Sequence, residues 1–122
     1  MNASKGILLF GHGARNPEWA RPFQRIREAI RAREPGLPVE PGFLELMQPD
    51  FAQGIAALVA QGAREIVVVP VFIAGGLHVG KELPALAAAA MERHAGVDIH
   101  LAPPLGEAET VLAAIADYAR GA

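Results

Sequence analysis

Two histidines and one glutamate are the side chains of this sequence best suited to handling a metal ion. His12 stands between two glycines, His78 follows the run Gly-Gly-Leu, and Glu45 lies between two leucines. Imidazole nitrogens and a carboxylate oxygen make up the ligand set of an open metal site, in which further positions stay free for a substrate. Histidine can also accept a proton near neutral pH, so these residues could carry acid–base chemistry as well.

Each of these residues also has an ordinary structural explanation. A lone histidine in a loop is more often a surface or hydrogen-bonding residue than a ligand. A glutamate at a strand end often only marks the point where the chain passes from the hydrophobic core to the surface. The remaining histidines are interpreted as structural. His94 lies near the expected C-terminus of a helix, where a basic group suits the helix dipole, and His100 lies within an expected strand.

Glycines accompany both candidate histidines. Gly11 and Gly13 flank His12, and Gly75 and Gly76 precede His78. Because glycine permits positive φ and lets a bulky ligand approach the main chain, these residues could contact a substrate. Tight turns between strands and helices would require the same residues, and the two interpretations are compatible.

Composition excludes several functions. The sequence contains no cysteine, which rules out a disulfide framework, a thiolate metal site and a cysteine nucleophile. The formal net charge is −2, from 11 basic and 13 acidic residues, and this balance is not that of a nucleic-acid-binding protein. There is no Gly-x-Gly-x-x-Gly fingerprint and no Walker A loop, and the one serine, Ser4, precedes the first expected strand. Dinucleotide binding and serine hydrolysis are therefore not expected.

The apolar runs of the sequence are short. None reaches the roughly 20 residues that a transmembrane helix needs. The first run, Ile7–Phe10, is too short for the hydrophobic region of a signal peptide. We therefore expect a cytoplasmic protein whose partner is neither a membrane nor a nucleic acid.

Strand and helix patterns alternate along the whole chain. Continuous apolar runs predict buried strands, and apolar residues at helical spacing predict amphipathic helices. Pro35-Gly36 should stop the first helix, Asp50 is a candidate N-cap for the second, and Gly62 and Gly96 should end the second and third. The expected strand segments are Ile7–Phe10, Phe43–Leu46, Ile66–Ile73 and Val97–Leu101. The expected helices carry Trp19, Phe23, Ile26 and Ile30; Phe51, Ile55, Leu58 and Val59; residues from about Lys81 to His94; and Val111, Leu112, Ile115 and Tyr118.

This alternation predicts a single α/β domain over residues 1–122, with a four-stranded parallel sheet and helices on both faces. Pro41-Gly42 suggests that the second strand lies at an edge or contains a bulge. Parallel connections put the carboxyl ends of all strands at one edge, where open α/β sheets bind ligands. We expect His12, Glu45 and His78 to meet at this edge, with His78 in a glycine-rich loop over residues 74–80.

Four ordered blocks of the sequence resemble the small CbiX-type sirohydrochlorin chelatases, which belong to the class II tetrapyrrole chelatases. The blocks are Leu9–Pro17 with its Gly-His-Gly, Phe43–Leu46 with Pro49, Val69–Val79 with Leu83-Pro84, and the turn Pro103–Gly106. They extend over nearly the whole chain. Two positions depart from the family pattern, because Ala14 stands where serine is common and Glu82 stands where aspartate is common.

The resemblance implies a flavodoxin-like half of a class II chelatase, and an enzyme that inserts a divalent metal into sirohydrochlorin, a tetrapyrrole bearing eight carboxylates. Cobalt is the metal expected first, on the route to cobalamin. Iron, on the route to sirohaem, and nickel are alternatives. The metal is a substrate in this reaction, and no organic cofactor is expected.

The resemblance also implies roles for individual residues. His12, Glu45 and His78 would hold the metal or take the protons of the pyrrole N–H groups. Arg15 and Lys81 are the nearest cations for the substrate carboxylates, although ordinary solvated charge explains them equally well. The implied substrate-binding set is Arg15, Gly75, Gly76 and Lys81.

Full-length class II chelatases have two similar lobes around a cleft, and this chain has the length of one lobe. The resemblance therefore implies a homodimer. Two other functions stay open. A non-catalytic metal or tetrapyrrole carrier would use His12, Glu45 and His78 but release its metal to a partner. In a flavodoxin-like regulatory or protein-binding domain the histidines would be incidental, and a lack of metal binding would favour that function.

Overall fold

The structure is a computed structural model that describes residues 4–122, including the side chains in that range except those of Leu77 and His78. The strands are β1 (Lys5–Gly11), β2 (Val39–Phe43), β3 (Glu65–Pro70) and β4 (Asp98–Leu101). The α-helices are α1 (Arg21–Arg33), α2 (Phe51–Ala60), α3 (Leu77–Arg93) and α4 (Glu109–Gly121), and the 3₁₀-helices are η1 (Pro17–Ala20) and η2 (Leu105–Glu107). Within the described range, no helix is both long and apolar enough to cross a bilayer.

The sheet is parallel throughout, with its strands in the order β2-β1-β3-β4. The predicted four-stranded parallel sheet is confirmed, and β2 lies at an edge, as Pro41-Gly42 suggested. The chain runs from β1 outward to β2 on one side and from β3 outward to β4 on the other. The strand order therefore reverses between β1 and β3, and ligands of open α/β sheets bind at the carboxyl ends beside such a reversal.

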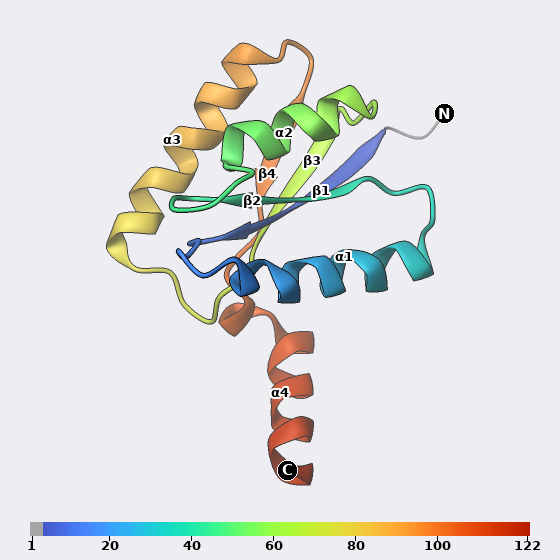
Figure 1. Cartoon of the computed structure of the whole chain (residues 1–122), viewed down its shortest axis with the longest axis vertical. Coiled ribbons are helices and arrows are strands. Elements are labelled where there is room, and N and C mark those ends of the chain that lie inside the picture. The colour runs from blue at the N-terminus through green and yellow to red at the C-terminus, as the bar shows by residue number, and fades with distance from the viewer. Residues whose placement is uncertain (1–3) are drawn as a thin grey trace.

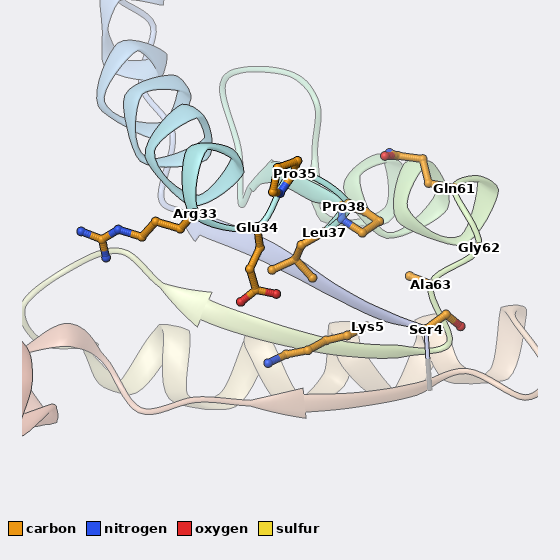
Figure 2. Close-up of a pocket in the computed structure, with 11 residues that line it drawn as sticks. Ser4, Lys5, Arg33, Glu34, Pro35, Leu37, Pro38, Gln61, Gly62 and Ala63 are labelled. Carbon is orange, nitrogen blue, oxygen red and sulfur yellow. The ribbon is translucent and has the colours of Figure 1, made fainter. Parts of the chain in front are cut away.

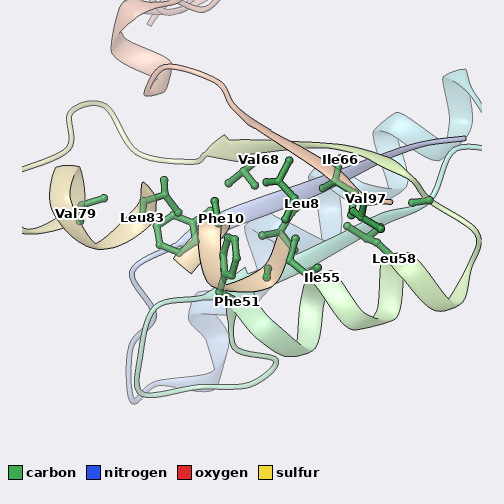
Figure 3. Close-up of a cluster of buried hydrophobic side chains, with 14 residues drawn as sticks. Leu8, Phe10, Phe51, Ile55, Leu58, Ile66, Val68, Val79, Leu83 and Val97 are labelled. Carbon is green, nitrogen blue, oxygen red and sulfur yellow. The ribbon is translucent and has the colours of Figure 1, made fainter. Parts of the chain in front are cut away.

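Helices cover both faces of the sheet, as predicted (Figure 1). α2 and α3 lie on one face, where Phe10 of β1 and Ile55 of α2 belong to the same buried cluster (Figure 3). α1 lies on the other face over β1 and β2, where Phe23 packs with Leu9 and Phe43. The rings of Phe23 and Phe43 meet edge-on, with centroids 5.0 Å apart. These two clusters fix the strand ends that carry the candidate site.

The last helix, α4, stands apart from the sheet. It packs mainly against η2 and projects away from the rest of the chain (Figure 1). Its apolar residues Leu112, Ile115 and Tyr118 are 43, 42 and 79% exposed. On the face that α1 covers, Val67 of β3 and its neighbour His100 of β4 lie outside the buried cluster beneath that helix. We call Val67 and His100 the open strip of the sheet.

Several predicted helix boundaries are confirmed. Asp50 caps α2, because its carboxylate accepts from the Gln53 backbone N–H and the Gln53 side chain accepts from the Asp50 N–H, each at 2.8 Å. α1 ends just before Pro35-Gly36. Gly62 and Gly96 follow α2 and α3 with φ of 96° and 81°, a backbone conformation that favours glycine.

The second strand lies nearer the N-terminus than predicted. It spans Val39–Phe43, so Pro41-Gly42 stands inside the strand and Leu44–Leu46 lies beyond its end. An edge strand tolerates proline, because one side of its backbone needs no partner. Glu45 therefore belongs to a loop rather than to a strand.

The third strand ends at Pro70 rather than at Ile73. The Val71 N–H still donates to the Phe10 carbonyl at 2.8 Å, but the next partner, the Leu105 N–H that donates to the Phe72 carbonyl at 3.0 Å, lies in η2 and not in a strand. Apolar and β-branched residues continue past Pro70 into the loop, so the sequence pattern predicted a strand end that lies too far along the chain.

Two helix assignments were wrong at their N-terminal ends. α3 begins at Leu77 rather than near Lys81, with Gly76 as its N-cap and the Gly80 N–H donating to the Gly76 carbonyl at 3.0 Å. Glycine lowers helix propensity, so this first turn looked like a loop. Trp19, assigned to the apolar face of the first helix, lies in η1 and is 51% exposed.

Candidate functional site

His12 is the first residue after β1, at the carboxyl edge of the sheet. Its side chain is exposed and meets the ring of Phe72, with centroids 4.9 Å apart and an angle of 40° between the ring planes. Phe72 follows β3, so this contact joins the ends of the two strands between which the strand order reverses. His12 therefore lies where a ligand of this fold is expected.

Glu45 lies beside His12, in the loop after β2. The Leu44 N–H donates to the Gly11 carbonyl at 2.9 Å, and the Glu45 N–H donates to the His12 carbonyl at 3.1 Å. These bonds extend the pairing of β1 and β2 beyond both strands. Glu45 is exposed, as is His12. The structure brings the two backbones together, and the roles of the two side chains stay predictions.

Gly13 makes this close approach possible. Its φ is 90°, and a Cβ at this position would collide with the carbonyl oxygen of Glu45. One residue further on, the Ala14 N–H donates to the thioether sulfur of Met47 at 3.4 Å. The loop after β1 is thus held against the loop after β2 at successive points. Any side chain at position 13 would push the two loops apart.

The loop after β2 has an unusual backbone. Leu46 has a φ of 68°, a conformation usually adopted by glycine or asparagine. Its side chain is 54% exposed. The left-handed conformation costs a residue with a Cβ roughly 1–2 kcal/mol. The loop surrounds a cavity of about 390 Å³, lined by Leu44, Glu45, Leu46, Met47, Gln48 and Asp50. Glu45 therefore borders a hollow at the edge of the sheet.

The structure describes the backbone of His78 but not its side chain. Its backbone belongs to the first turn of α3, after β3, so the predicted loop is a helix at this position. Among the side chains described, no three histidine, cysteine, aspartate or glutamate groups lie together as a metal site would require. The convergence of all three candidates is therefore still a prediction.

Gly75 and Gly76 line a cavity of about 270 Å³ between β3, β4 and the start of α3. The surrounding side chains are mostly apolar, and they include Phe72, Val79, Leu83 and Pro104. Because Phe72 also meets His12, this cavity adjoins the candidate metal residue. The position of the two glycines suits the substrate-binding role predicted for them.

The predicted cations lie on the surface. Arg15 follows the His12 loop, and Lys81 lies in the second turn of α3; both are exposed. Neither forms an ion pair with a residue in the described part of the chain. Their charges are therefore available to an anionic ligand.

Sequence reasoning missed an apolar component of the site. Trp19, Leu46 and Ile73 are 51, 54 and 62% exposed, and they belong to the segments that follow β1, β2 and β3. Because β1, β2 and β3 all end at the carboxyl edge, these exposed side chains are candidates for an apolar part of the binding surface. Sequence reasoning assigned Trp19 to a helix core and Ile73 to a strand, so their exposure was not anticipated.

A larger cavity lies at the opposite edge of the sheet. It has a volume of about 630 Å³ and is lined at the amino ends of the strands by residues such as Lys5, Arg33, Glu34 and Gln61 (Figure 2). None of the predicted site residues lines it. Because ligands of open α/β sheets bind at the carboxyl edge, size alone does not make this cavity the functional site.

Known proteins similar to this chain identify its family. The family model CbiX matches residues 6–122. A sirohydrochlorin cobaltochelatase of Methanocaldococcus jannaschii is 32% identical over 90 residues, which cover 74% of this chain and 63% of that protein. The chain thus matches less than two thirds of the length of this relative.

Two solved structures of chelatase-type proteins have a similar fold. A CbiX protein of Marinobacter aquaeolei VT8, whose proposed role is cobalamin (vitamin B12) biosynthesis, superposes with a TM-score of 0.81 at 28% identity, covering 96% of this chain and 95% of the other. The sirohydrochlorin chelatase SirB of Bacillus subtilis subspecies spizizenii, solved in complex with cobalt, gives 0.78 at 30% identity, covering 97% of this chain but 50% of SirB. By its family model, its relatives and its fold, the chain belongs to the CbiX family.

Proposed function

We propose that this protein is a sirohydrochlorin chelatase, which inserts Co²⁺ into the macrocycle and works as a homodimer. The observation that carries the proposal is the pairing of the loops that follow β1 and β2, which sets exposed His12 and Glu45 side by side at the carboxyl edge. Both residues lie beside the reversal of strand order, in a chain of the CbiX family.

The proposed metal residues are His12, Glu45 and His78. Imidazole and carboxylate ligands from the protein leave coordination positions open, and those positions are needed for the macrocycle nitrogens. These ligands accept cobalt, iron and nickel alike. Cobalt is favoured because the M. jannaschii relative is a cobaltochelatase. SirB has been solved both with cobalt and with Fe³⁺.

Insertion requires that two pyrrole N–H protons leave the macrocycle as the metal enters. A histidine or a carboxylate next to the metal can accept such a proton, and His12 and Glu45 are both exposed to a substrate at this edge. The macrocycle must also bend so that its nitrogen lone pairs point at the metal. Contacts of the substrate carboxylates with Arg15 and Lys81 would supply binding energy for that distortion.

The surface around His12 suits a flat, largely apolar ring system. Trp19, Leu46 and Ile73 expose apolar area in the segments that follow β1, β2 and β3. The apolar cavity at Gly75 and Gly76 adjoins His12 through Phe72. Burying this area against a macrocycle would contribute roughly 25 cal/mol for each Å² removed from water. The peripheral carboxylates would stay at the rim, within reach of the cations.

The proposed partner is a second copy of the chain. SirB is about twice as long as the part that this chain matches, so a second copy would supply the missing lobe. The unpartnered apolar face of α4, with Leu112 and Ile115, and the open strip of the sheet both lack a partner within the described chain. α4 of each copy could cover the open strip of the other, which would bury both surfaces at once.

The test is an anaerobic assay in which purified protein is mixed with free sirohydrochlorin and excess Co²⁺, Fe²⁺ or Ni²⁺. An enzyme converts many macrocycles per protein molecule, and we expect this with Co²⁺ at the highest rate. A non-catalytic carrier, the alternative function, would bind metal or tetrapyrrole stoichiometrically without multiple turnovers. A protein that binds neither would be a regulatory domain of the same fold.

A further inference from the structure

Phe72 makes the one ring contact that the His12 side chain has with the described residues. The two centroids are 4.9 Å apart with the planes tilted by 40°, and no hydrogen bond joins the imidazole to a described residue. A ring contact restricts the rotation of the imidazole and uses neither of its nitrogens. Both nitrogens therefore stay available to a metal or a proton.

Phe72 is itself held in place from several sides. Its ring meets the fully buried ring of Phe10 at 6.2 Å, in an edge-on arrangement of 69°. Its carbonyl oxygen accepts from the Leu105 N–H at 3.0 Å, and a Cβ added at Gly75 would lie 3.3 Å from its ring. Phe72 thus continues the packed core outward to an exposed histidine.

From this geometry we propose that Phe72 is a positioning residue, which holds the His12 imidazole in the orientation that binds the metal. The inference rests on the proposed role of His12 as a metal residue. A free imidazole on an exposed loop samples several rotamers, and binding would have to select one of them. The ring of Phe72 restricts the imidazole to fewer rotamers before the metal binds, so less conformational entropy is lost on binding.

The chain offers a matched control. Phe51 meets the same Phe10 ring at 6.0 Å and 77°, and it is 3% exposed, but it has no contact with His12. Phe51→Leu and Phe72→Leu each remove one aromatic partner of Phe10. Only Phe72→Leu also removes the contact with His12. A difference between the two variants therefore reports on His12 and not on the core.

The experiment uses Co²⁺ alone, with no macrocycle, so that its outcome is independent of insertion activity. Phe72→Leu should weaken Co²⁺ binding roughly 2- to 10-fold, the size expected of one aromatic pair. Phe51→Leu should leave the affinity unchanged, and Phe72→Tyr, which keeps the ring, should restore it. Phe72→Met, whose flexible side chain can fill an irregular gap without a ring, gives the same test if Phe72→Leu folds poorly.

A second readout follows His12 directly. The imidazole proton resonances of His12, assigned with His12→Ala, should move toward their random-coil positions in Phe72→Leu or Phe72→Met and stay in place in Phe51→Leu. Unchanged resonances without the Phe72 ring would overturn the proposal, as would equal losses of Co²⁺ affinity in the Phe51 and Phe72 variants. If the wild type binds Co²⁺ with the expected Phe72 dependence but inserts no metal, the proposed function fails and the positioning role stands.

Discussion

The backbone N–H of Glu45 donates a hydrogen bond to the carbonyl oxygen of His12 at 3.1 Å. The bond lies between main chains, so it persists when either side chain is replaced. It sets two residues whose side chains are of the types that can bind a metal at one edge of the sheet, and substitutions there can change the chemistry without moving the loops.

Glu45→Gln keeps the shape of the side chain and this backbone bond but removes the negative charge. We expect the rate of metal insertion to fall by roughly 10-fold or more, with the melting temperature unchanged. A loss of Co²⁺ affinity would assign Glu45 to the metal, and a loss of turnover at unchanged macrocycle affinity would assign it to proton transfer. Glu92→Gln, on the exposed surface of α3, is the control. Insertion at the wild-type rate in Glu45→Gln would contradict both roles.

Gly13→Ala tests the close approach of the two loops. The added Cβ would collide with the Glu45 carbonyl at a φ of 90°, so we expect the free energy of unfolding to fall by roughly 2 kcal/mol or more, together with Co²⁺ affinity. Gly36→Ala is the control, since a Cβ added at Gly36 would have no neighbouring atom within 4 Å. That variant should gain stability or stay neutral. Equal denaturation midpoints for both variants would show that the loops are not locked.

Leu46→Asn tests the left-handed backbone of the β2 loop. Asparagine tolerates the φ of 68° better than leucine, so the free energy of unfolding should rise by roughly 0.5–1 kcal/mol. Affinity for the macrocycle should fall, because an exposed apolar contact is lost. Ile73→Asn, which replaces another exposed apolar residue without a positive φ, should lower the affinity without the gain in stability. Chemical denaturation and fluorescence titration measure the two effects.

The homodimer is tested at α4. Ile115→Glu puts a charge on the apolar face of this helix, and light scattering at micromolar concentration should report a dimer for the wild type and a monomer for the variant. Ala113→Glu places the same charge on the opposite face of α4 and should stay dimeric. A wild-type protein that is monomeric and still inserts metal would disprove the dimer. An Ile115→Glu variant that remains dimeric would show that α4 is not the contact.

Much of the fold could be predicted from the sequence because its signals are local. The apolar runs of β1 and β3, the capping residue Asp50 and the glycines after α2 and α3 each act within a few residues. Boundaries next to Gly76 and Pro70 were placed wrongly, since glycine-rich and β-branched segments there resemble a loop and a longer strand. The separation of α4 from the sheet could not be predicted, because amphipathicity shows that a helix needs a partner but not which one.

The site was predicted in part for a similar reason. Parallel topology dictates that residues after β1 and β2 share an edge, so the proximity of His12 and Glu45 could be anticipated. The ring contact of His12 with Phe72 and the exposure of Leu46 depend on the paths of loops. Those paths follow from long-range contacts, such as the Leu105 N–H to Phe72 carbonyl bond, that no periodicity contains.

The proposed function depends on His12 handling the metal during insertion. The most direct measurement is the anaerobic rate of Co²⁺ insertion into sirohydrochlorin by wild type and His12→Ala, with the fold of both checked by circular dichroism. The wild type should complete many turnovers, and His12→Ala should lose most of that rate while its spectrum is unchanged, because the exposed imidazole carries little core packing. Insertion by His12→Ala at the wild-type rate would contradict the assignment of the site.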